Sequence, residues 1–329
     1  MKSFCMGLAA LLALGSAAQA EPVKLRVDSG VLVGVSEDGV NVFKGAPYAK
    51  PPVGKLRWAP PQRISWKGER DATEYALPCP QQTPESGPNR GGVAGATSED
   101  CLYLNVWAPK NAENAPVMLW LYGGAGFLGA GSLGTYDGTS FAKDGVIVVT
   151  INYRLGMLGE FAHPALTKAA KADEPLANYQ LMDAVAALEW VQRNAKALGA
   201  DPKNVTLFGQ SAGAVMVGAL LSTPPSKGLF QKAIIQSAVP LLGGGRTLAQ
   251  AEADGVKFAN TLGLDGAKAT LAELRALSVE EVISDKARGP GFYNGSYLIL
   301  DGRFRPITTG EGFASGATAD VPLIVGSTK

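Results

Sequence analysis

Ser211 stands in a pattern that is typical of serine nucleophiles. The stretch from 205 to 213 reads Val-Thr-Leu-Phe-Gly-Gln-Ser-Ala-Gly, and its last five residues fit Gly-x-Ser-x-Gly. An apolar run precedes the motif and a run rich in Ala, Val and Leu follows it, which is the strand–turn–helix setting of a nucleophile elbow. Glycines at 209 and 213 let the two elements approach closely. The pattern predicts that Ser211 is a catalytic nucleophile; a glycine-rich packing turn is the alternative.

A second stretch suits the same chemistry. Trp120-Leu-Tyr-Gly-Gly-Ala-Gly126 follows an apolar run, and a loop of such small residues can aim backbone N–H groups at a developing oxyanion. We expect Gly124 and Ala125 to be donors, together with Ala212 behind the serine, while Gly123 permits the turn. The alternative is a plain glycine-rich loop. A phosphate cradle is disfavoured because no Gly-Lys-Ser/Thr follows.

Activating a serine takes a base, and the sequence contains a single histidine, His163. It lies upstream of Ser211, in Phe161-Ala-His-Pro164, where a histidine before proline indicates a turn residue and not the general base. Three carboxylates are candidate acids by residue type only, and we expect each to be structural or solvated. They are Asp301, Glu311 and Asp320.

Composition narrows the possible partners. Lys and Arg total 30 and Asp and Glu total 29, so the net charge is 30 − 29 = +1, and no basic patch indicates nucleic acid. Beyond the first 20 residues, two cysteines and one histidine make no convincing metal cluster. We therefore expect no metal, no cofactor, and a small-molecule substrate; the oligomeric state stays open.

The first 20 residues predict a cleaved signal peptide. Lys2 gives a basic start, residues 8–14 form an apolar run, and Ala18-Gln-Ala20 is a suitable cleavage site. The apolar run is too short to span a bilayer, although an uncleaved anchor or a buried helix is the alternative. We expect a secreted or periplasmic protein. In such a compartment Cys79 and Cys101 would form a disulfide; two free thiols are the alternative.

Apolar runs alternate with a helical periodicity from residue 102 onward, which predicts a largely parallel sheet covered on both faces. Residues 21–329 are treated as one domain, with a smaller β-rich part at its start. Expected strands are 27–35, 40–43, 102–107, 117–122, 146–151, 205–208, 233–237 and 321–325. Expected helices are 177–198 and 212–221, with two or three more within 247–288.

Several motifs in order make the chain similar to the type-B carboxylesterases, the cholinesterase-like branch of the α/β hydrolases. They are Phe43-Lys-Gly-Ala-Pro-Tyr-Ala49, Ser98-Glu-Asp-Cys-Leu-Tyr-Leu-Asn-Val106, Asn152-Tyr-Arg-Leu-Gly156, the Ser211 elbow and Gly228-Leu-Phe230. The resemblance implies an α/β-hydrolase fold and a serine carboxylic-ester hydrolase that works through an acyl-enzyme. It also implies that Cys79 and Cys101 form the family's first disulfide. An ion pair between Arg57 and Glu99 is implied beside it, the alternative being two solvated charges.

The sequence departs from the family in informative places. Gln210 replaces a common glutamate, and Gly126 replaces a common aromatic residue, which would widen the acyl side of the pocket. The loop between the two cysteines has no aromatic residue for a quaternary ammonium, so we do not expect a cholinesterase.

The resemblance also places the family's acid just beyond a strand like 321–329 and its histidine much later. We therefore expect that the C-terminal part with both residues is missing here. The alternative is a complete but catalytically defective chain with a binding or vestigial role.

Overall fold

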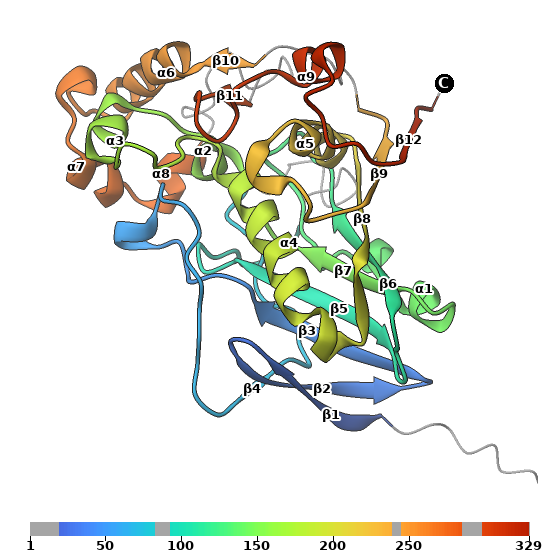
Figure 1. The fold of residues 1–329 in the computed structure, drawn as a ribbon. Helices are drawn as coiled ribbons and strands as arrows, with labels where there is room; N and C mark the ends of the chain where they lie inside the picture. The colour runs from blue at the N-terminus through green and yellow to red at the C-terminus, as the bar shows by residue number, and fades with distance from the viewer. Residues whose placement is uncertain (1–19, 83–92, 239–244, 285–297, 329) are drawn as a thin grey trace, which may run out of the picture.

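The computed structural model describes residues 20–82, 93–238, 245–284 and 298–328. Within these ranges the main sheet has ten strands in the order β1-β2-β3-β5-β7-β6-β8-β9-β12, with β4 paired to β2 (Figure 1). The order reverses at β7–β6–β8, so segments far apart in sequence meet there. The expected signal peptide lies outside the described residues, apart from Ala20. The extent of the domain stays a prediction.

The sheet has an antiparallel half and a parallel half. The strands β1, β2, β3, β5 and β7 pair antiparallel to one another in that order. From β7 onward β6, β8, β9 and β12 are parallel. Strand bounds are β1 Glu21–Val27, β2 Gly30–Glu37, β3 Val40–Pro47, β4 Glu69–Asp71, β5 Tyr103–Pro109, β6 Ala115–Leu121, β7 Ile147–Ile151, β8 Ala200–Gln210, β9 Lys232–Gln236 and β12 Leu323–Gly326. A separate pair joins β10 Arg246–Thr247 and β11 Ile299–Leu300.

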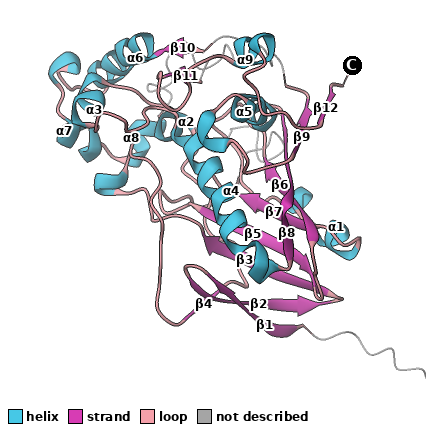
Figure 2. Cartoon of the chain, viewed as in Figure 1, coloured by secondary structure: helices cyan, strands magenta, loops and turns pink. Residues whose placement is uncertain are grey.

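Helices α4 and α5 cover one face of the parallel half (Figures 1 and 2). Val117, Leu119 and Leu207 point to that face and are fully buried. Helix bounds are α1 Thr139–Lys143, α2 Gly156–Gly159, α3 Pro164–Ala169, α4 Tyr179–Leu198, α5 Ala212–Leu221, α6 Leu248–Thr261, α7 Leu271–Ala276, α8 Val279–Ile283 and α9 Thr309–Ser315. None of the helices described is both long and apolar enough to traverse a bilayer. The α/β-hydrolase prediction agrees with this arrangement, and so does the expectation of two or three helices within 247–288, where α6, α7 and α8 lie.

The opposite face differs from the prediction. Trp120, Phe208, Ile234 and Ile324 lie side by side across four strands. Helix α1 packs on β5 and β7 near this face, but the row becomes more exposed toward β12, where Ile324 is 65% exposed. The sequence predicted a sheet covered on both faces, but among the described residues this face is covered less completely than the face under α4 and α5.

Two strands were placed less well by the pattern. The single strand expected over 27–35 is interrupted: Val27 ends β1, Asp28 and Ser29 form a turn, and β2 begins at Gly30. β1 buries only Leu25 and Val27, so its apolar signal is too weak to distinguish an edge strand from a loop. β8 begins five residues before its apolar run.

Candidate active site

Ser211 occupies the turn between β8 and α5, as its motif predicts. Its backbone angles are φ 54° and ψ −121°, a conformation that residues with a side chain rarely adopt outside constrained sites. The Ser211 N–H donates to the Gln236 carbonyl at 2.8 Å, and the Val215 N–H donates to the Ser211 carbonyl at 3.0 Å. These bonds hold the turn in place. The Ser211 side chain is partly exposed and does not cap α5.

Steric constraints explain why both outer positions of the motif are glycine. A Cβ on Gly213 would lie 2.0 Å from the Leu121 carbonyl oxygen and 2.5 Å from that of Tyr122. A Cβ on Gly209 would lie 2.7 Å from the Gly213 carbonyl. Strand β8, helix α5 and the end of β6 therefore touch backbone to backbone, which only residues without a side chain allow.

The loop after β6 reaches the serine. A Cβ on Gly123 would lie 3.0 Å from the Ser211 Cβ and 2.7 Å from the Gln210 side-chain oxygen. Gly124 and Ala125 both have positive φ, at 117° and 53°. No hydrogen bond within the described residues uses the N–H of Gly124 or Ala125. The structure thus brings the two motifs together, while the convergence of three N–H groups on one oxygen stays a prediction.

The third expected donor, Ala212, is the first residue of α5. Its position places it at the positive end of the helix dipole, which favours a nearby negative charge. The electrostatic setting of the elbow is therefore the one expected for an oxyanion.

His163 is fully buried and structurally engaged. Its Nδ1 accepts a hydrogen bond from the Ala165 N–H at 3.1 Å, which caps α3, and its Nε2 lies 2.9 Å from the Gly266 carbonyl oxygen. Because Nδ1 is the acceptor, Nε2 carries the proton. Both ring nitrogens are therefore occupied, which confirms the prediction of a structural histidine.

The candidate acids are structural or solvated, as expected. Asp301 is buried and accepts from the backbone N–H groups of Leu176, Phe304 and Arg305. Glu311 caps the start of α9 through the Thr308 N–H, and Asp320 is exposed. In the described part of the chain, no group of three or more His, Cys, Asp or Glu could hold a metal ion.

The disulfide and the ion pair that the sequence predicted are both present. Cys79 and Cys101 are bonded, with their Cα atoms 5.0 Å apart. Arg57 and Glu99 make two hydrogen bonds of 2.7 and 2.5 Å, and their side chains are only 8% and 12% exposed. The alternative of two solvated charges is therefore wrong.

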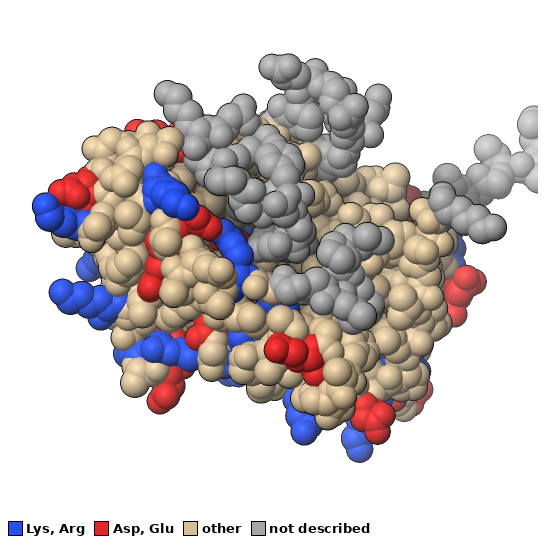
Figure 3. Space-filling model, turned by 90° about the horizontal axis from the view of Figure 1, so that it is seen from above, with Lys and Arg blue, Asp and Glu red and all other residues tan. Residues whose placement is uncertain are grey.

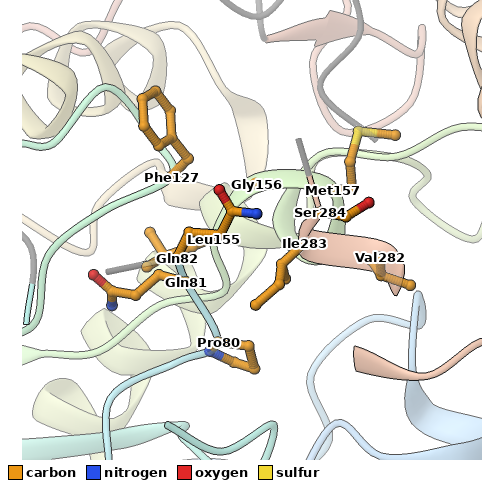
Figure 4. Close-up of a pocket in the computed structure, with 10 residues that line it drawn as sticks. All are labelled: Pro80, Gln81, Gln82, Phe127, Leu155, Gly156, Met157, Val282, Ile283 and Ser284. Carbon is orange, nitrogen blue, oxygen red and sulfur yellow. The ribbon is translucent and has the colours of Figure 1, made fainter. Parts of the chain in front are cut away.

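A shallow, mainly apolar cavity lies beside the loop after β6, residues 123–131, the glycine loop. Its lining comes from Phe127 in this loop, the segment after Cys79, the start of α2 and the end of α8 (Figure 4). The lining residues are Pro80, Gln81, Gln82, Phe127, Leu155, Gly156, Met157, Val282, Ile283 and Ser284. An uncharged organic group suits such a surface.

One buried acid was not anticipated from the sequence. Glu160 is 1% exposed, and burial raises its pKa to about 8, although Gln180 donates to it at 2.7 Å and Arg246 and Arg305 attract its charge. The only sequence signal was a glutamate in the apolar stretch Leu158-Gly-Glu-Phe161.

Glu160 should make the fold less stable as pH rises. In the unfolded chain the carboxyl would lose its proton near 4.5, but in the fold it keeps the proton to about 8. Unfolding therefore releases a proton between these values, and stability falls as pH rises through this window. We expect Glu160→Gln to flatten that fall, measured as urea midpoints from pH 5 to pH 8. The exposed Glu280→Gln is the control, and equal slopes in both variants would contradict the assignment.

Comparisons with known proteins place this geometry in a family. The profile of the carboxylesterase family matches residues 21–329. The chain is 40% identical over 327 residues to the fumonisin B1 esterase of Sphingopyxis macrogoltabida, covering 95% of this chain and 57% of that protein. It is 41% identical to the para-nitrobenzyl esterase of Bacillus subtilis, covering 91% and 61%.

Solved structures agree. A thermophilic para-nitrobenzyl esterase superposes with a TM-score of 0.82 at 38% identity, over 93% of this chain and 63% of that one. A carboxylesterase of Geobacillus stearothermophilus, Est55, gives a TM-score of 0.79 at 38% identity, over 93% and 61%. The chain thus spans about three fifths of the length of these relatives. It belongs to the carboxylesterase family.

Proposed function

We propose that this chain carries the nucleophile and the oxyanion hole of a serine carboxylic-ester hydrolase. The observation that carries the proposal is the strained Ser211 turn packed against Gly123. Ser211 Oγ would attack the ester carbonyl and form an acyl-enzyme with loss of the alcohol, and water would then release the acid. The N–H groups of Gly124, Ala125 and Ala212 would stabilise the oxyanion.

The base and its acid partner would be supplied from outside these 329 residues. Support comes from His163, whose two ring nitrogens are both engaged elsewhere. The substrate would be a small-molecule ester, as membership of the carboxylesterase family supports. Two relatives are named a para-nitrobenzyl esterase and a fumonisin B1 esterase, which makes a nitroaromatic ester a suitable probe.

Covalent trapping tests the nucleophile. We expect diisopropyl fluorophosphate to phosphorylate Ser211, slowly in plain buffer and faster with added imidazole, which stands in for the base. Mass spectrometry of proteolytic peptides maps the adduct. Ser211→Ala should lose it. Ser237→Ala is the matched control, because Ser237 also has a positive φ, of 55°, at the end of the neighbouring strand β9.

The same experiment addresses the second candidate function, a catalytically defective binding or vestigial protein. This candidate is favoured by the commitment of the one histidine to structure. Adducts spread evenly over surface serines, or none on Ser211 with imidazole present, would refute the nucleophile and support this alternative.

We also propose that the protein is exported to the periplasm or the medium. Support comes from the leader pattern of residues 1–20 and from the Cys79–Cys101 disulfide, which persists in oxidising compartments.

A further inference from the structure

The segment after Cys79 is bonded directly to the glycine loop through one side chain. The Gln81 Nε2 donates to the Gly129 carbonyl at 2.8 Å, and the Gly129 N–H donates to the Gln81 Oε1 at 2.8 Å. The same Nε2 also donates to the Cys79 carbonyl at 3.1 Å. Gln81 is only 6% exposed, so both ends of its amide are used within the protein interior.

Gly129 in turn fixes the start of the loop. It has a φ of 113°, and a Cβ there would lie 2.5 Å from the Tyr122 ring and 2.9 Å from the Gly123 carbonyl oxygen. The loop therefore folds back on itself, with Gly129 packed on the residues that lead into the proposed oxyanion donors. A displacement of Gly129 would therefore disturb its packing against Tyr122 and Gly123.

The other end of this connection is covalently anchored. Gln81 lies two residues after Cys79, which is bonded to Cys101. Glu99, two residues before Cys101, is held by Arg57, and Arg57 also donates to the Leu277 carbonyl at 2.5 Å. The disulfide and the contacts of Arg57 thus hold the backbone next to Gln81 in place.

We infer that Gln81 is a positioning residue that holds the oxyanion loop, and that the disulfide acts on the loop through it. The inference rests on the function proposed above. An amide that pairs with both the N–H and the carbonyl of Gly129 holds the two peptide planes that flank this residue, as a neighbouring strand would. Accurate placement of oxyanion donors is what such a loop requires, because loss of one donor costs on the order of 10²–10³ in rate.

Hydrogen exchange on the full chain tests the placement. Gln81→Met keeps the length but removes all three hydrogen bonds of the side chain, and Gln81→Glu keeps only the bond accepted from the Gly129 N–H. We expect amide exchange in peptides covering 123–131 to rise about tenfold or more in Gln81→Met. It should rise in Gln81→Glu too, because a buried carboxylate would face the Gly129 and Cys79 carbonyls. The control is Gln192→Met, since Gln192 also bonds two backbone carbonyls, of Pro202 and Leu229. It should leave exchange in this loop unchanged.

A second hydrogen-exchange experiment compares the wild-type protein before and after reduction of the Cys79–Cys101 disulfide, and it needs no variant. Reduction should raise exchange in the same peptides, and should add little in Gln81→Met if the two act through one route. Unchanged exchange of the loop amides in Gln81→Met would overturn the inference. If the variants do not fold, unchanged exchange in the reduced wild type would overturn it. Fully additive effects would disprove the link to the disulfide.

Phosphorylation of Ser211 gives the chemical readout. With imidazole present, its rate should fall about tenfold or more in Gln81→Met and not in Gln192→Met. If exchange changes as expected but wild-type Ser211 never reacts, the proposed function fails and the role of Gln81 in holding the loop stands. If Ser211 reacts equally in both variants, the positioning role fails and the proposed function stands.

Discussion

Supplying a carboxylate and a histidine to this chain is expected to raise its hydrolysis of p-nitrophenyl butyrate by about 10⁴–10⁶-fold, because Ser211 would then have a base. Without them, the elbow and the glycine loop should leave only a residual ~10³–10⁴-fold enhancement over water. The segment could be taken from the C-terminal part of the B. subtilis relative, of which this chain covers 61%. Release of p-nitrophenol measures the rate.

Two variants give this experiment its controls. Ser211→Ala in the extended protein should return the rate to the residual level. His163→Ala in the 329-residue chain should lower stability but leave the residual rate of the folded protein unchanged, because that ring contacts Ala165 and Gly266 and not Ser211. Robust turnover by the unextended chain that disappears in His163→Ala would make His163 the base and contradict the proposal.

Asp183→Ala is expected to destabilise the fold by about 3–5 kcal/mol, because it would leave a buried arginine without its counter-charge. Asp183 accepts from the Arg154 backbone N–H at 3.0 Å and from its Nε and Nη2 at 2.8 and 2.7 Å. The side chains are 0% and 3% exposed. Urea unfolding followed by circular dichroism measures the loss.

A surface pair provides the matched control. Lys24 and Glu69 are also in contact, but their side chains are 61% and 52% exposed, so Glu69→Ala should cost less than about 1 kcal/mol. Replacing both members of the buried pair, as Arg154→Met with Asp183→Leu, should recover much of the loss, since no charge is then left buried. Equal losses for Asp183→Ala and Glu69→Ala would show that burial does not govern this pair.

Sequence reasoning succeeded where a local pattern has a single steric or chemical explanation. The Ser211 elbow could be read because Gly213 must touch the Leu121 and Tyr122 carbonyls, and no other residue allows that approach. Helix α5 was placed at its observed bounds, and α4 within two residues, because apolar side chains recur at helical spacing. The disulfide and the Arg57–Glu99 pair followed from export and from the family resemblance.

Other features could not be predicted because they join ordinary residues that are distant in sequence. Nothing about Gln81 indicates that it pairs with a glycine 48 positions away. Likewise the partner of Glu160, Gln180, lies on another element. The fold determines such contacts, and a single sequence contains no periodicity that reports them.

Strand β12 closes the sheet order with its outer edge unpaired among the described strands. Ile324 and Val325 are 65% and 56% exposed on its two faces. An open edge with apolar side chains offers backbone donors and acceptors to any extended segment, including the same strand of another molecule. In concentrated solution the 329-residue chain would therefore be prone to self-association. Its purification would depend on preventing β12 of one molecule from pairing with β12 of another.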